Sequence, residues 1–268
     1  MKSLFTFLLL FVFSFSGTAQ EYAVEQLENS PRHHEWVTLE SSGRTMHNFV
    51  AYPEREDKAP VIIVIHENRG LNDWARSFTD QLAGKGFIAI APDLISNTVE
   101  GFKKTADFPT SDEARSAIYN LNPENVRADL QAVLEYAESI EAGNGQVAVV
   151  GFCWGGSQSF RFATNAGDKI EAALVFYGTG PADSEEYAGI RAPVYGFYGG
   201  SDSRVNSTIE ASEEAMEEYG KVYEYEIYEG AGHAFMRRGD NPEAPADNPN
   251  VIARNKSWKR LVKILNNL

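Results

Sequence analysis

The sequence predicts an α/β fold, a mostly parallel central sheet with helices on both faces. Between residues 60 and 232, short apolar runs alternate with amphipathic helix patterns, which is typical of strand–helix–strand units. The run 61–65 consists of five β-branched residues, as expected for a strand that is buried on both faces. Comparable runs, each predicted to be a buried strand, span residues 87–91, 147–150, 172–177 and 194–198.

Three helices are predicted between these strands. Trp74, Phe78 and Leu82 lie on one face of a helix that two following glycines should end. Asn125 is expected to cap a longer helix, whose apolar residues recur at spacings of three and four. Ser207 is expected to cap the third helix, in which a row of glutamates should face solvent.

The two ends of this region predict further elements. Residues 35–39 and 47–52, joined by a short turn, are predicted to form an antiparallel hairpin at the edge of the sheet. Residues 222–228 alternate glutamates with tyrosine and isoleucine, as expected for a strand with one face exposed to solvent. Residues 258–268 carry apolar side chains at helical spacing and are predicted to form a helix that could pack back on the sheet. Because no linker or repeat interrupts the pattern, we expect one domain over residues 20–268.

Residues 1–19 are predicted to be a secretory signal peptide. Lys2 precedes an apolar run over residues 4–15, and small residues lead to a cleavage point near Ala19. The run is shorter than the roughly 20 residues that a membrane span needs. We therefore expect an exported protein, periplasmic or extracellular, that has no membrane anchor after cleavage. His33 and His34, near the new N-terminus, are expected to be exposed and without a catalytic role.

Composition excludes several classes of function. The 268 residues carry a formal charge of −14, which argues against a nucleic-acid-binding surface. The single cysteine can form neither an internal disulfide nor a cysteine-based zinc site. In an oxidising compartment this cysteine has no structural partner, so its presence needs another explanation.

That cysteine lies in the sharpest local motif of the chain. Residues 147–156 read as a strand, a tight turn and the start of a helix, with Cys153 at the apex between Gly151 and Gly155. This is a nucleophile elbow, in which the flanking glycines let strand and helix approach closely. Helix N–H groups should favour the thiolate, which can lower a cysteine pKa from about 8.5 to roughly 3.5–7.5. The alternative to a catalytic role is that Cys153 is a small buried apolar residue and that the neighbouring glycines serve only packing.

A base and an acid follow in the order that an elbow requires. Asp202 comes directly after the predicted strand 194–198, and His233 directly after the last strand. His66-Glu67-Asn68 follows the first buried strand, where an oxyanion donor should lie. The backbone N–H groups of Asn68 and Trp154 are therefore the expected oxyanion hole. A zinc-helix interpretation of His66-Glu67 fails, because a glycine stands where the second histidine should be.

These residues together resemble the dienelactone hydrolase family, which has the α/β-hydrolase fold. The similarity spans roughly residues 35–268. Its main motifs are Gly151-Phe152-Cys153-Trp154-Gly155-Gly156, His66-Glu67, Ala91-Pro92-Asp93-Leu94 and Ala231-Gly232-His233-Ala234-Phe235.

The resemblance implies a Cys153–Asp202–His233 triad that hydrolyses an ester, lactone or similar acyl bond of a small molecule without a cofactor or metal. It implies that Glu67 hydrogen-bonds the resting thiol and helps to deprotonate it when substrate binds. It also implies that Arg237 binds a substrate carboxylate. A second such arginine of the family has no clear counterpart in residues 94–97.

Two other functions remain open from the sequence: a thiol redox protein that uses Cys153 as a sensor, and a binding protein on a hydrolase scaffold. Residues 96–124 lack strong periodicity and are expected to cover the pocket. In that segment Lys103, Lys104 and Arg115 are candidates for holding an anionic substrate, although exposed basic residues are more often simply solvated.

Overall fold

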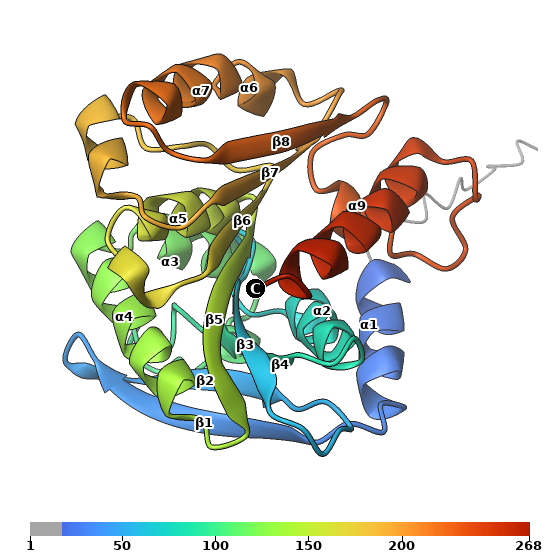
Figure 1. The fold of residues 1–268 in the computed structure, drawn as a ribbon. Helices are drawn as coiled ribbons and strands as arrows, with labels where there is room; N and C mark the ends of the chain where they lie inside the picture. Colours follow the sequence, from blue (N-terminus) through green and yellow to red (C-terminus); the bar gives the residue numbers. More distant parts are fainter. Residues whose placement is uncertain (1–17) are drawn as a thin grey trace, which may run out of the picture.

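The computed structural model describes residues 18–268, and its centre is an eight-stranded sheet (Figure 1). The strand order is β1-β2-β4-β3-β5-β6-β7-β8. The first two neighbouring pairs are antiparallel and all the others are parallel, which confirms the predicted fold class. The strands are β1 (His34–Ser41), β2 (Arg44–Ala51), β3 (Ala59–Ile65), β4 (Ile88–Pro92), β5 (Gly143–Phe152), β6 (Ala172–Phe176), β7 (Val194–Gly199) and β8 (Tyr223–Tyr228).

The hairpin β1–β2 forms one edge of the sheet, as predicted. Its turn is made by Ser42 and Gly43, both with positive φ (52° and 72°), and Ser41 pairs with Arg44. Positive φ at both central residues matches the right-handed twist of the flanking strands, which fixes the register of the hairpin.

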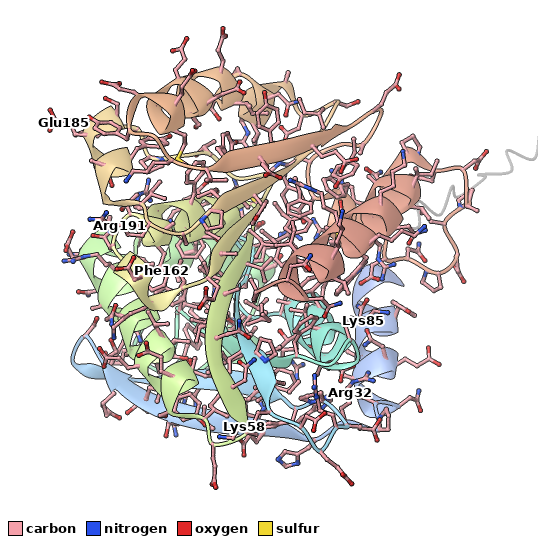
Figure 2. The ribbon with its side chains drawn as sticks, in the orientation of Figure 1. Arg32, Lys58, Lys85, Phe162, Glu185 and Arg191 are labelled. Carbon is pink, nitrogen blue, oxygen red and sulfur yellow. The ribbon has the colours of Figure 1, made fainter. Side chains whose placement is uncertain are left out.

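Helices cover both faces of the sheet (Figure 1). Side chains of β3 alternate between two apolar clusters: Ile62 and Val64 face one, whereas Val61, Ile63 and Ile65 face the other. The first cluster packs against α1 (Thr18–Glu28), α2 (Asp73–Ala83) and α9 (Pro249–Leu265), and the second against α4 (Pro123–Ser139), α5 (Trp154–Ala163) and α7 (Ile209–Glu218). Charged side chains such as those of Lys58, Lys85 and Glu185 are exposed at the periphery (Figure 2).

Helix ends follow local capping chemistry, with two corrections to the predictions. Helix α2 ends at Gly84, as predicted. Helix α4 is capped by Asn122 rather than Asn125, because Pro123 at its first position fixes a helical φ one turn earlier. The predicted cap at Ser207 was also wrong. Ser207 ends the short helix α6 (Ser203–Asn206), and Thr208 precedes α7.

The N-terminal helix α1 was not predicted, because its pattern is weak. Ala23 is buried in the first cluster and Leu27 packs against it, whereas Val24 is exposed. The predicted signal peptide lies almost entirely outside the described residues; its last two residues, Thr18 and Ala19, begin α1. None of the helices within residues 18–268 has the length and hydropathy that crossing a membrane requires.

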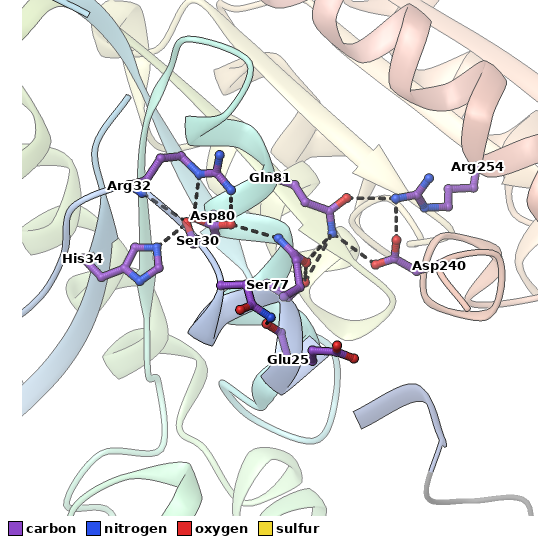
Figure 3. A network of polar contacts seen from close by, with 11 residues as sticks. Glu25, Ser30, Arg32, His34, Ser77, Asp80, Gln81, Asp240 and Arg254 are labelled. Carbon is purple, nitrogen blue, oxygen red and sulfur yellow. Dashed lines mark hydrogen bonds and ion pairs between the residues drawn. The ribbon is translucent and has the colours of Figure 1, made fainter. Parts of the chain in front are cut away.

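The chain after α1 is tied to α2 by a buried carboxylate (Figure 3). Asp80 is fully buried and accepts hydrogen bonds from Arg32 Nε (2.7 Å) and Ser30 Oγ (2.6 Å), and His34 Nε2 lies 2.7 Å from its Oδ1. Burial opposes ionisation of Asp80, yet the hydrogen bonds from Arg32, Ser30 and His34 hold its pKa below the ordinary value. The expectation that His34 is exposed was therefore wrong, whereas His33 is exposed.

Candidate active site

Cys153 lies at the turn between β5 and α5 in a strained backbone conformation. Its φ is 56° and its ψ −115°, a combination that is rare for a residue with a side chain. A Cβ at Gly151 would overlap the carbonyl of Gly155, and a Cβ at Gly155 would overlap the carbonyls at the end of β3. The close contact of strand and helix that the sequence predicted is therefore present, and it requires both glycines.

The three predicted catalytic side chains meet at the carboxyl ends of β5, β7 and β8. His233 Nε2 lies 3.1 Å from Cys153 Sγ, and His233 Nδ1 lies 2.5 Å from Asp202 Oδ2. Asp202 is buried and also caps α6, where its Oδ1 accepts from the N–H of Val205 (3.4 Å). With the ring proton on Nδ1 donated to Asp202, Nε2 is free to accept the thiol proton.

The pKa of the thiol is opposite to the sequence-based expectation. Burial raises the pKa of Cys153 to about 11, and the nearby charge of Glu67 adds to this effect. The backbone N–H groups of Trp154 and Asn68 act in the other direction but do not compensate. The prediction of a lowered pKa was wrong, because it counted the helix N-terminus and omitted burial and the carboxylate.

Glu67 is buried and bonded to Arg237, not to the thiol. Arg237 Nε donates to Glu67 Oε2 (2.8 Å), and the Tyr177 hydroxyl donates to Oε1 (3.4 Å). The charge of Glu67 and its hydrogen bond raise the pKa of Arg237. The contact expected between Glu67 and the resting thiol is absent among the hydrogen bonds of residues 18–268. The site instead holds a buried carboxylate–guanidinium pair beside the sulfur.

Tyr177 belongs to this site although it was predicted only as the last residue of a strand. It follows β6, has a φ of 41°, and is almost completely buried. Its ring packs edge-on against that of His233, with centroids 5.1 Å apart. Burial and the charge of Glu67 raise the pKa of its hydroxyl well above 10, so it stays protonated and acts as a donor. The only signal in the sequence was its position at the carboxyl end of a central strand.

The predicted oxyanion donors lie on two segments that pack together. The N–H groups of Asn68 and Trp154 both act to lower the pKa of the Cys153 thiol. His66 is fully buried, stacks on the Trp154 ring (5.7 Å between centroids), and accepts from the N–H of Leu94 (3.4 Å). Burial lowers its pKa to about 4, so the ring is neutral and fixes the loop after β3.

Residues 96–124 contain two helices that were not predicted, η1 (Thr105–Asp107) and α3 (Ser111–Tyr119). Helix α3 buries mainly alanines, which gives a weak apolar pattern. Of the three basic candidates in this segment, Lys104 lines a cavity together with Arg237. Arg115 instead lies over the Tyr119 ring. Lys103 is exposed and does not line that cavity.

The arrangement brings together the Cys153 thiol, the His233 imidazole and the Asp202 carboxylate, with the N–H groups of Asn68 and Trp154 nearby. Within residues 18–268, no group of three or more His, Cys, Asp and Glu side chains is placed to hold a metal ion. A sulfur nucleophile with these neighbours can form and break acyl bonds: the base accepts the thiol proton, and the N–H groups bind the oxygen that becomes negative.

Comparison with known proteins gives consistent matches. The model of the dienelactone hydrolase family matches residues 46–268. Proteins of Saccharolobus solfataricus and Salmonella typhimurium, both described as "putative carboxymethylenebutenolidase", are 26% and 30% identical to this chain. The alignments cover 85% of this chain and 96% of the first protein, and 74% and 76% for the second. The crystal structure of a dienelactone hydrolase-like promiscuous phosphotriesterase from metagenomic libraries is similar in fold, with a TM-score of 0.73, 21% identity, and coverage of 88% of this chain and 98% of that one.

Proposed function

Because this chain belongs to the dienelactone hydrolase family, we propose that it hydrolyses carboxylic ester or lactone bonds through a covalent acyl-enzyme on Cys153. The observation that carries the proposal is the connected set Cys153 Sγ, His233 and Asp202, with distances of 3.1 and 2.5 Å, on a strained elbow. These are the contacts that a nucleophile and its oriented base need before substrate arrives.

Acylation begins from a neutral thiol, because the pKa of Cys153 is about 11. His233 Nε2 accepts the thiol proton while Sγ attacks the acyl carbon, and the imidazolium is stabilised by Asp202. The carbonyl oxygen becomes negative and accepts hydrogen bonds from the N–H groups of Asn68 and Trp154. Loss of one such donor typically costs about 2.7–4 kcal/mol of transition-state stabilisation.

The tetrahedral intermediate then collapses to a thioester. The bond from the acyl carbon to the leaving oxygen breaks, and His233 Nε2–H gives its proton to that oxygen. A water molecule, deprotonated by the same nitrogen, attacks the thioester carbon. The C–S bond breaks, the carboxylic acid leaves, and the proton on His233 returns to Cys153.

Glu67 affects this cycle through charge. Bonded to Arg237, it disfavours the thiolate in the resting enzyme. The role implied by the family resemblance, deprotonation of the thiol, requires the Glu67–Arg237 pair to open when substrate binds. A substrate anion that competes for Arg237 would have this effect.

Export is part of the same proposal and is supported by the residue pattern of the first nineteen residues. Cleavage near Ala19 would remove only the first two described residues of α1. Ala23 and Leu27, which pack on the first apolar cluster, would remain. N-terminal sequencing of protein recovered outside the cytoplasm tests this directly: an intact Met1 in that fraction would contradict it.

The test of the hydrolase proposal uses the purified protein with a panel of aryl esters, thioesters and enol-lactones. Cys153→Ala and His233→Ala should abolish turnover, and mass spectrometry should detect an acyl group on Cys153 with a slow substrate. Absence of turnover on the whole panel, together with an unmodified Cys153, would refute the proposal.

Peroxide oxidation of Cys153 that is independent of Asp202 and reversed by reductant would favour a redox sensor instead. The raised thiol pKa argues against that function, since sensor cysteines have low pKa values.

A further inference from the structure

A cavity of about 600 Å³ adjoins the candidate active site on the side of Arg237. This volume is in the range of small-molecule pockets. Arg69, which follows the oxyanion residue Asn68, and Arg237, which is bonded to Glu67, both line it. Trp36 of the edge strand β1 lines it as well. Cys153 does not line the cavity, so any molecule that reacts at the sulfur and fills the cavity must be extended.

Positive charge predominates on the wall of this cavity, in a chain whose net charge is −14. Four basic side chains line it, and two of them are neutralised: Arg237 by Glu67, and Arg76 by its ion pair with Asp73. Among residues 18–268, no ion pair involves Arg69 or Lys104. The cavity wall therefore carries two cations, the exposed Arg69 and the half-buried Lys104, that are not neutralised by an ion pair among these residues.

The acidic groups on the wall do not offset these cations. Asp73 is engaged with Arg76. Asp93 is buried and accepts from the N–H and hydroxyl of Thr105 (2.6 and 2.7 Å), and burial raises its pKa to about 6. Both carboxylates are thus already bonded within the protein.

Lys104 is held in place by its neighbours. Its backbone N–H donates to Asp107 Oδ2 (3.0 Å), and its ammonium lies 4.7 Å from the centre of the Trp36 ring. The adjacent Thr105 is bonded to Asp93 and accepts from the N–H of Leu71 (2.9 Å). The chain segment that carries Lys104 is therefore fixed to β4 and to the loop after β3, so the cation is oriented before a ligand binds.

Apolar side chains line the same cavity as these cations. Trp74, Leu71 and Phe108 line the cavity together with Trp36, a residue that is 40% exposed. An exposed indole next to an unpaired ammonium suits a ligand that has an apolar body and an anionic end.

We propose that this cavity binds the distal part of an extended acyl substrate that ends in a carboxylate, with Arg69 and Lys104 holding the anion and Trp36 and Phe108 contacting its apolar chain. The proposal rests on the proposed hydrolase function and names its substrate class: esters of long, terminally anionic acids. The carboxylate is recognised at a distance from the scissile bond, apart from any contact of a substrate with Arg237.

The test compares para-nitrophenyl hemiesters of dicarboxylic acids of increasing chain length with the same esters bearing a terminal carboxamide. At the length that reaches the cavity, kcat/KM for the acid should exceed that for the amide by about tenfold, as expected for one hydrogen bond between charged groups. Lys104→Gln and Arg69→Gln should each lower this acid-to-amide ratio. Lys103→Gln removes the same charge at an exposed neighbouring position and is the matched control.

A binding measurement separates this proposal from the hydrolase proposal. Calorimetry with the terminal monoamides of the same diacids, which lack a scissile ester, reports anion recognition even if no ester is turned over. Binding that is tighter than that of the diamides and is lost in Lys104→Gln supports the cavity proposal. Equal dissociation constants for acid and amide at every length, or an equal loss in Lys103→Gln, would overturn it. Thermal melting of each variant verifies the fold.

Discussion

Replacement of Glu67 with glutamine tests the electrostatic account of the Cys153 thiol. An ordinary cysteine has a pKa of about 8.5 to 9.0, and burial together with the Glu67 charge raises the pKa of Cys153 from 9.0 to about 11. At pH 8, a pKa of about 11 leaves about one molecule in a thousand as thiolate, against about one in ten at the ordinary value. Alkylation by iodoacetamide proceeds through the thiolate, so its rate at Cys153 should be about a hundredfold lower than that of an unperturbed thiol.

Glu67→Gln keeps the side-chain size and removes the charge. Burial is the larger cause of the raised pKa and remains in the variant, so only part of the shift should be lost. A decrease of about one pKa unit corresponds to a tenfold larger thiolate population, or about 1.4 kcal/mol. We therefore expect alkylation at pH 8 to become about tenfold faster, with the midpoint of the pH–rate profile still above that of an ordinary thiol.

Arg237→Gln is the control that removes the other member of the Glu67–Arg237 ion pair. It removes the cation that is bonded to Glu67 and so leaves the carboxylate less compensated beside the sulfur. Alkylation should then be as slow as in the wild type or slower, although the same ion pair is broken. Equal rates for the wild type and Glu67→Gln would refute the reasoning, and so would a wild-type midpoint at or below about 9.

Three further predictions concern the base, the elbow and the N-terminal contact. Asp202→Asn should lower kcat by roughly 10⁴, as expected when the histidine loses its orienting carboxylate, with little change in thermal stability. Gly151→Ala should give protein that is insoluble or melts well below the wild type, because its Cβ would overlap backbone of the following helix; wild-type melting would contradict this. Asp80→Asn should reduce the free energy of unfolding by roughly 3 kcal/mol at pH 7, whereas the exposed Asp57→Asn should not. Because the folded-state pKa of Asp80 is lowered, this difference should persist above pH 5 and shrink below about pH 4 in denaturation curves.

The parts of the fold that the sequence predicted well are those with a strong local signal. The run 61–65 forms the last five residues of β3, because β-branched residues without a polar break fit a strand that is buried on both faces. The elbow was recognised because the steric need for glycine on both sides of Cys153 is itself local. The positions of Asp202 and His233 followed from the rule that such residues lie beyond strand ends, and the structure brings all three side chains together.

The parts that were missed depend on contacts between distant segments. His34 looked like a surface residue, since nothing near it in the sequence shows that Asp80 is buried opposite it. Helix α3 buries small side chains and so lacks a visible apolar stripe. The hydrogen-bond partner of Glu67 could be inferred only from the family resemblance. In the structure its carboxylate accepts a hydrogen bond from Arg237 and not from the Cys153 thiol. Side chains of this kind acquire their roles from the tertiary fold alone.

The pKa of Cys153 shows how such a contact changes a chemical conclusion. The helix N-terminus was correctly located, and the N–H group of Trp154 there does lower the thiol pKa, but burial and the Glu67 carboxylate from the loop after β3 outweigh it. In the proposed mechanism the enzyme therefore has no preformed thiolate, and proton transfer to His233 must accompany attack on the acyl carbon. The N–H groups of Asn68 and Trp154 then gain their full charge-assisted hydrogen bonds only when the substrate oxygen becomes negative. Interactions that strengthen only in the transition state are those that accelerate the reaction. A small thiolate population also limits oxidation of the sulfur, because oxidants attack the thiolate, and that property suits the proposed exported location.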